Sequence, residues 1–104
     1  MPRKRALGAA TVAIMKAIQD GRRFGLDIMD ETGLASGTVY PTLARMEARA
    51  YLESEWEGED AAKAAGRPPR RYYRITPEGT TALLEAVEHL AAMAGLHPRP
   101  AEQG

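Results

Sequence analysis

The chain has 104 residues, of which 44% are hydrophobic and 27% charged, as expected for one small globular domain rather than a disordered segment. It has no cysteine, which excludes disulfides, thiolate metal sites and cysteine nucleophiles. No apolar stretch is long enough for a signal peptide or a membrane span, so we expect a cytoplasmic protein without a membrane partner.

The formal net charge is zero, but the charges are unevenly distributed. Residues 1–5 form a basic arm that contains Arg3, Lys4 and Arg5, and residues 61–77 are basic without any acid. A neutral total is therefore compatible with one basic face and one acidic face. The arm is interpreted either as a contact to DNA phosphates or as a solvated terminus.

An apolar stripe with helical spacing predicts a first helix at about Ala6–Asp20. The stripe includes Leu7 and Ile14, and apolar residues extend onto another side of the helix. A helix with such a wide apolar surface is expected to be central or to contact a second molecule.

A short second helix is predicted at about Phe24–Thr32, and Gly33 is expected to end it. Arg22 and Arg23 directly precede this helix. Because free N–H groups at a helix N-terminus favour anions, these arginines are candidate phosphate contacts.

The stretch Leu34–Arg49 predicts a third helix, which completes a helix-turn-helix. Pro41 favours a start near Thr38 rather than Ser36, because a proline in the first turn removes no hydrogen bond. One face lacks acids and is either an ordinary solvated face or a surface that reads bases in the major groove. Its hydroxyl and guanidinium side chains are Thr38, Thr42, Arg45 and Arg49.

After the third helix the apolar period changes to two, which predicts strands at Tyr51–Glu57 and at residues 70–76. The twelve residues between them, GEDAAKAAGRPP, are expected to form a mobile loop. A helix-turn-helix followed by such a hairpin is a winged helix.

Acidic residues of the first strand are expected to pair with arginines of the second across the hairpin. The acids are Glu53, Glu55 and Glu57, and the arginines are Arg70 and Arg74. Lys63 and Arg67 lie nearer the loop tip, so they are the stronger candidates for DNA contacts.

A last helix is predicted at Pro77–Ala94, with Thr76 as its cap, within a dimerisation segment at residues 77–95. Its apolar seam packs either on its own domain or on a second copy, together with the first helix. The candidate interface residues are Leu7, Ile14, Leu83, Val87, Leu90 and Ala94. Residues 96–104 are expected to form a flexible tail.

Catalytic and metal-binding motifs are absent from the sequence. Glu85 and His89 are four residues apart, but one such pair is expected to be a surface pair rather than a metal site. We therefore expect neither an enzyme nor a cofactor.

Several motifs together resemble the PadR family of bacterial transcriptional regulators, over about Ala6–Leu90. They are Gly37-Thr38-Val39-Tyr40-Pro41, Trp56-Glu57, Gly66-Arg67-Pro68 and Tyr72-Tyr73-Arg74-Ile75-Thr76. The resemblance implies a winged-helix repressor that dimerises through its C-terminal helix and its first helix and binds a two-fold-symmetric operator. It also implies that Tyr40 lies at the DNA surface and that residues 66–68 belong to the wing.

The sequence departs from the family pattern at Phe24, where tyrosine is commoner, and at Ala50, where a glycine commonly ends the recognition helix. Some family members bind flat aromatic ligands between tryptophans of the C-terminal helix. This chain has its one tryptophan, Trp56, outside that helix, so a ligand pocket of that design is not expected.

The predicted fold is α+β and mostly α: a winged helix-turn-helix at residues 6–76 followed by a C-terminal dimerisation helix. The predicted function is a sequence-specific regulator that binds double-stranded DNA as a homodimer. Two alternatives share the fold, namely a protein-binding module without an operator and a sensor controlled by a small molecule. The candidate DNA contacts are Thr38, Tyr40, Thr42, Arg45, Arg49, Lys63, Arg67, Arg22, Arg23, Arg3, Lys4 and Arg5.

Overall fold

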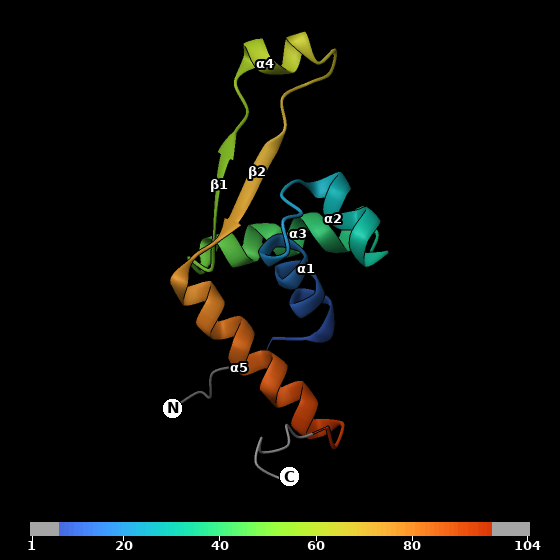
Figure 1. The fold of residues 1–104 in the computed structure, drawn as a ribbon, viewed down its shortest axis with the longest axis vertical. Coiled ribbons are helices and arrows are strands. Elements are labelled where there is room, and N and C mark those ends of the chain that lie inside the picture. Colours follow the sequence, from blue (N-terminus) through green and yellow to red (C-terminus); the bar gives the residue numbers. More distant parts are fainter. Residues whose placement is uncertain (1–6, 97–104) are drawn as a thin grey trace, which may run out of the picture.

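The computed structural model describes residues 7–96, which form five helices and a two-stranded antiparallel sheet (Figure 1). The elements are α1 (Ala9–Gln19), α2 (Gly25–Thr32), α3 (Ser36–Ala48), β1 (Leu52–Trp56), α4 (Glu59–Ala64), β2 (Arg71–Ile75) and α5 (Pro77–Met93). This order is that of a winged helix-turn-helix with a C-terminal helix, which confirms the fold predicted from the sequence.

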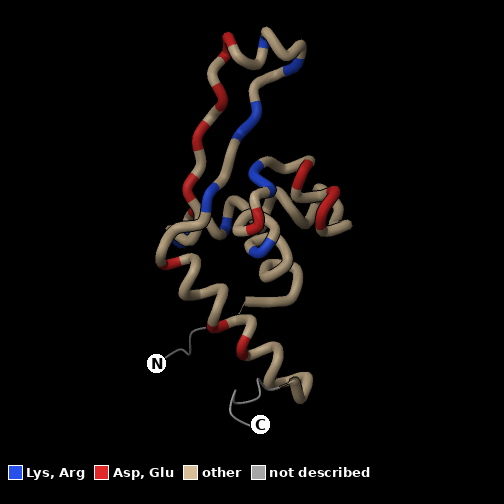
Figure 2. Tube along the Cα trace, viewed as in Figure 1, with Lys and Arg blue, Asp and Glu red and all other residues tan. Residues whose placement is uncertain are grey.

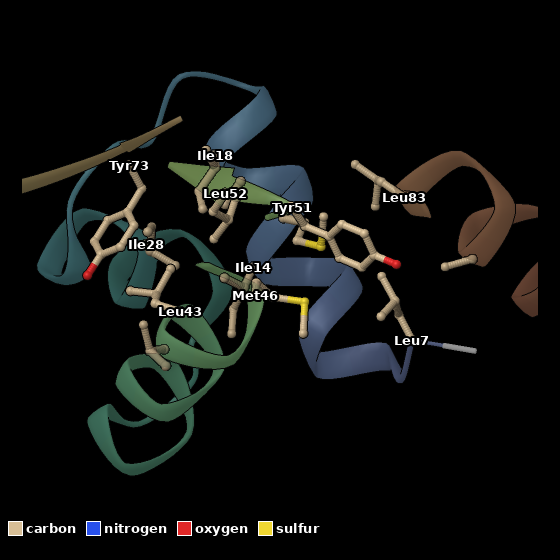
Figure 3. Packing of buried hydrophobic residues seen from close by; sticks show 14 residues of the cluster. Leu7, Ile14, Ile18, Ile28, Leu43, Met46, Tyr51, Leu52, Tyr73 and Leu83 are labelled. Carbon is tan, nitrogen blue, oxygen red and sulfur yellow. The ribbon is translucent and has the colours of Figure 1, made fainter. Parts of the chain in front are cut away.

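The hydrophobic core lies where the first three helices meet the base of the hairpin, and Leu83 and Ala86 of α5 extend it (Figure 3). Each helix contributes the apolar residues of a single stripe, so their polar faces remain in water. The largest fully buried side chains are Ile14, Met15, Ile28, Val39, Leu43 and Leu52. Removal of this apolar surface from water is the main stabilising contribution to the fold.

The hairpin is fixed to the helix-turn-helix at its base. β1 and β2 pair in a register that runs from Leu52 opposite Ile75 to Trp56 opposite Arg71. The main-chain N–H of Tyr73 donates a hydrogen bond of 2.8 Å to the carbonyl oxygen of Arg23. The segment between α1 and α2 therefore lies along the outer edge of β2, the strand nearer α2 in Figure 1.

The start of α5 is held by a side-chain cap, as the sequence predicted. The hydroxyl of Thr76 accepts a hydrogen bond from the N–H of Gly79 at 2.9 Å and donates one to the carbonyl oxygen of Ala50 at 2.7 Å. Ala50 has a left-handed φ of 64°, a conformation that favours glycine, so this hydroxyl anchors a strained turn. A Cβ on Gly79 would overlap the carbonyl oxygen of Tyr51, so only glycine allows this close approach.

α3 begins at Ser36, so the prediction of a start near Thr38 is wrong. Pro41 is consequently inside the helix rather than in its first turn, and the carbonyl of Gly37 lacks the usual donor four residues on. Gly37 and Pro41 are both exposed, so water can satisfy that carbonyl. Because the missing hydrogen bond lies on the solvent-exposed side of α3, the buried apolar stripe of the helix is unaffected.

The long connection between the strands is not a featureless loop, because it contains α4. Alanine has the highest helix propensity, acids occupy the first turn and Lys63 the last, as the helix dipole favours. Ala62 is buried, and Gly66 ends the segment with a φ of 73°. The prediction of a mobile loop without secondary structure is therefore wrong, because it overlooked the helix propensity of the alanines.

The predicted dimer seam is only partly available at the surface of one chain. Leu7, Ile14 and Leu83 are buried in the core of the chain itself, so the prediction that they contact a second copy is wrong. Leu90 is half-buried, whereas Val87 and Ala94 are exposed. The apolar side chains that α5 and the residues after it leave exposed are Leu84, Val87, Met93 and Leu96.

Candidate nucleic-acid interface

The exposed face of α3 presents no unpaired carboxylate. Small residues follow the middle of this face, with Tyr40 along one edge and the side chains of Thr38, Arg45 and Arg49 along the other. The small exposed residues are Gly37, Pro41, Ala44 and Ala48. Such a surface can approach a groove floor closely while longer side chains reach to either side.

Thr42 does not lie on this exposed face. Its side chain is 2% exposed, so the prediction that it contacts DNA is wrong. Its hydroxyl oxygen accepts a hydrogen bond of 3.1 Å from the guanidinium of Arg45. Thr42 therefore orients Arg45 from below rather than touching a ligand itself.

Arg49, at the C-terminal end of α3, lies against an aromatic ring. Its guanidinium carbon is 5.0 Å from the ring centroid of Tyr51, within the range of a cation–π contact. Arg49 is exposed and has no carboxylate partner among residues 7–96. It remains available to an anion.

Tyr40 is half-exposed and lies across the first turn of α2. A Cβ on Gly25 would overlap the phenol of Tyr40, so the glycine makes room for this ring. Sequence order alone does not show that the side chain packed against Gly25 belongs to the recognition surface. Gly25 is therefore a functional candidate that only the three-dimensional arrangement identifies.

The wing separates its charges by strand, with acids along β1 and bases along β2 (Figure 2). The guanidinium of Arg74 contacts the carboxylates of Glu53 at 2.9 Å and of Glu55 at 3.2 Å, as predicted. Arg71 pairs with Glu47 of α3 at 3.4 Å and donates to the hydroxyl of Ser54 at 2.9 Å. These pairs occupy two arginines of the second strand.

Arg67 is also neutralised, although its place near the loop tip predicted a stronger contact with DNA than that of Arg70. Its guanidinium makes two contacts with the carboxylate of Glu57, one of them at 2.9 Å. These hydrogen bonds lower the pKa of Glu57 to about 2, and the hydrogen bond from the N–H of Arg70 acts in the same direction. A lowered pKa means that the pair is intact at neutral pH and is lost only as the pH falls through about 2.

The arginines before α2 differ from one another. Arg22 contacts Asp27 at 3.1 Å and Glu31 at 3.4 Å, so its charge is already compensated. Arg23 instead lies over the ring of Tyr72, 5.3 Å from its centroid. Of the two, Arg23 is the better placed for a phosphate.

Ten lysines and arginines lie between residues 7 and 96, and five of them are in ion pairs within that range. The five without such a pair are Arg23, Arg45, Arg49, Lys63 and Arg70. The predicted contacts Arg3, Lys4 and Arg5 lie outside the described residues.

A cavity of about 390 Å³ separates α2 and α3 from the wing. Its walls are aromatic, apolar and guanidinium groups, among them Phe24, Tyr40, Trp56, Pro68 and Arg70. The cavity therefore adjoins both the recognition helix and the basic strand of the hairpin.

No group of three or more histidine, cysteine or acidic side chains converges within residues 7–96 to hold a metal ion. Among the described helices, none has the length and apolar character required to cross a bilayer.

Comparison with known proteins supplies the family. The sequence model of the "Transcriptional regulator PadR-like family" matches residues 14–85. The chain is similar to the Transcriptional regulator Rv3488 of Mycobacterium tuberculosis (strain ATCC 25618 / H37Rv), with 48% identity over 61 residues. That match covers 56% of this chain and 51% of the relative, so the chain spans about half the length of that curated relative.

Two solved structures share the fold. A PadR family transcription regulator of Clostridium difficile R20291 matches with a TM-score of 0.72 and 22% identity, over 86% of this chain and 94% of that chain. BpsR of Bordetella bronchiseptica, whose DNA binding is regulated by 6-hydroxynicotinic acid, matches with a TM-score of 0.67 and 22% identity. The second match covers 98% of this chain and 75% of that chain.

Proposed function

This chain belongs to the PadR-like family of transcriptional regulators, not to an enzyme family, and membership implies DNA binding. On that premise we propose that it is a cytoplasmic repressor that binds a two-fold-symmetric site in double-stranded DNA as a homodimer. The observation that carries the proposal is the exposed face of α3, where Thr38, Tyr40, Arg45 and Arg49 surround a strip of small residues. Arginine and threonine can read base edges there by hydrogen bonds and methyl contacts.

The remaining cations supply contacts to the sugar-phosphate backbone, which fix register without reading sequence. Lys63 lies on the wing helix α4, and Arg23 lies before α2. The arm with Arg3, Lys4 and Arg5 is proposed to add phosphate or minor-groove contacts. Arg22 and Arg67 are proposed to contribute less to DNA binding, because carboxylates already neutralise their charges.

The test is a gel shift with the DNA upstream of the protein's own gene at physiological salt. A discrete complex that survives excess unrelated DNA is the expected result. Retardation that is equal for every sequence and disappears with salt would favour a winged-helix module that binds protein instead. A small molecule that changes the affinity for the discrete site would identify the regulator as a sensor.

Replacing Lys63 by alanine is expected to weaken binding to all DNA sequences alike. Lys63 has no ion pair within residues 7–96, so its charge is free to neutralise a phosphate. Each phosphate contact contributes about 0.9 to the slope of log K against log salt, and this slope should fall by about that amount. Titrations at several salt concentrations measure it, with Lys16→Ala as the control because Lys16 is paired with Asp20 at 2.7 Å. An unchanged slope would remove Lys63 from the interface.

We propose that dimerisation uses the apolar stripe that α5 leaves uncovered. Leu84, Val87, Ala91 and Ala94 follow one another at helical spacing, and none of them is fully buried. A two-fold axis that pairs this stripe with its copy would hide it from water and place two recognition helices on one face of DNA.

Replacing Val87 by aspartate is expected to convert the dimer to a monomer, because the carboxylate would lose its hydration in the interface. Light scattering across a concentration range measures the mass. His89→Asp, which adds the same charge away from the stripe, should leave the dimer intact. If the unaltered chain is a monomer at every concentration, the proposed dimer is refuted.

A further inference from the structure

Four side chains between the start of α2 and the end of the hairpin that lies away from its base alternate between guanidinium and aromatic groups. The guanidinium of Arg23 lies 5.3 Å from the ring centroid of Tyr72, and the Tyr72 ring meets Phe24 edge-on at 5.9 Å. The guanidinium of Arg70 lies 3.9 Å from the centroid of Phe24. Together these residues, Arg23, Tyr72, Phe24 and Arg70, form what we term the cation–aromatic column.

The local backbone brings the column together. Arg70 and Tyr72 are two residues apart in the chain entering and forming β2, so their side chains lie on one face of the strand. Arg23 and Phe24 lie next to that strand because the carbonyl of Arg23 accepts the N–H of Tyr73. Phe24 has an extended backbone as the residue that caps α2, which turns its ring toward the wing.

Arg70 differs from the other arginines of the wing in its electrostatic state. Arg67, Arg71 and Arg74 are paired with carboxylates, whereas within residues 7–96 the guanidinium of Arg70 has no ion pair. It is the N–H of the Arg70 main chain, not its side chain, that donates to Glu57, at 3.1 Å. A guanidinium stacked over a ring keeps the N–H donors along its edge free.

The position of Arg70 also suits a DNA strand. Arg70 and Tyr40 line the same cavity between α3 and the wing, so an anion held by Arg70 would lie beside the recognition helix. We propose that Arg70 is a binding site for a DNA backbone phosphate and that Phe24 is the residue that positions it. The inference rests on the proposed DNA-binding function and reverses the order of Arg67 and Arg70 expected from the sequence.

The test compares Arg70→Ala, Phe24→Leu and Phe24→Tyr with the unaltered protein on its selected DNA site and on unrelated DNA. Arg70→Ala should reduce both affinities several-fold and lower the salt slope by about 0.9, as the loss of one phosphate contact requires. Phe24→Leu keeps apolar volume but removes the ring, so it should also lower the salt slope. Phe24→Tyr keeps the ring and should bind like the unaltered protein.

The double variant Phe24→Leu with Arg70→Ala separates positioning from simple packing. If Phe24 acts through Arg70, the double variant should bind DNA no more weakly than Arg70→Ala alone. Arg74→Ala is the matched control, because that arginine is exposed on the same strand but paired with two glutamates. Its salt slope should change less than that of Arg70→Ala.

Thermal unfolding verifies that each variant is folded. If Phe24→Leu does not fold, Arg70→Lys takes its place, because lysine keeps the positive charge but cannot stack flat on the ring.

An unchanged slope for Arg70→Ala would overturn the assignment of the phosphate site while leaving the proposed function in place. Additive losses in the double variant would overturn the positioning role of Phe24. If the unaltered protein selects no DNA sequence and binds none at physiological salt, the proposed function and this inference both fail.

Discussion

Replacing Arg45 by alanine is expected to weaken binding to the selected DNA site by about 1–3 kcal/mol and to relax the preference at one base pair, because arginine reads guanine through two hydrogen bonds. Arg45 is exposed on α3 and has no carboxylate partner among residues 7–96. Its contact with Thr42 limits the directions in which the guanidinium can point. Binding to unrelated DNA should fall much less, because a base contact is lost rather than only a charge.

Titrations on the selected site and on variants of it at each base pair measure both effects. Lys16→Ala is the control, because this lysine is paired with Asp20 at 2.7 Å, lies outside the proposed interface and should change affinity little. If Arg45→Ala binds the selected site as tightly as the unaltered protein does, the recognition face is assigned wrongly. A loss that is equal for all sequences would make Arg45 a phosphate contact instead.

Replacing Leu43 by alanine is expected to lower the free energy of unfolding by about 2–5 kcal/mol. Leu43 is fully buried at the centre of the α3 stripe, so alanine would leave a cavity that the surrounding side chains can fill only in part. A small domain has about 5–15 kcal/mol of stability, so the variant would lose much of its margin. Urea unfolding followed by circular dichroism measures the difference.

Leu43→Met is the matched control, since it nearly conserves volume and should lower stability by less than about 1.5 kcal/mol. If alanine and methionine lower stability by the same small amount, the side chain is not packed as the structure places it. DNA affinity measured well below the unfolding transition should be little changed in Leu43→Met, because Leu43 faces away from the recognition surface.

The periodicity of the sequence predicted most of the fold, because apolar spacing and caps are local properties. The change from helical to alternating spacing after Ala50 marks the wing correctly, and Thr76 caps α5 as expected. Two local features were misread for a physical reason. Pro41 is tolerated within α3 because it lies on the wet side, and the alanines of the wing form α4 because their helix propensity outweighs the neighbouring glycines and prolines.

The candidate site was less predictable because it depends on contacts between distant segments. Helical spacing placed Thr42 beside Arg45, but could not show that the stripe of α3 is wide enough to bury it. Sequence order likewise could not show that Glu57 reaches Arg67 across the hairpin while Arg70 turns to Phe24. Ile14 was wrongly predicted to lie in the dimer interface for the same reason, because an apolar stripe alone does not show whether its own chain or a second copy covers it.

The central claim is that the chain reads a specific DNA sequence as a symmetric dimer, and selection from a random DNA pool with the purified full chain tests it most directly. The account predicts enrichment of a two-fold-symmetric site with half-sites about one helical turn apart, or a multiple of that distance. This site should be bound at least about a thousandfold more tightly than unrelated DNA at physiological salt. A pool that stays random after repeated rounds, with binding that depends on salt alone, would contradict the account.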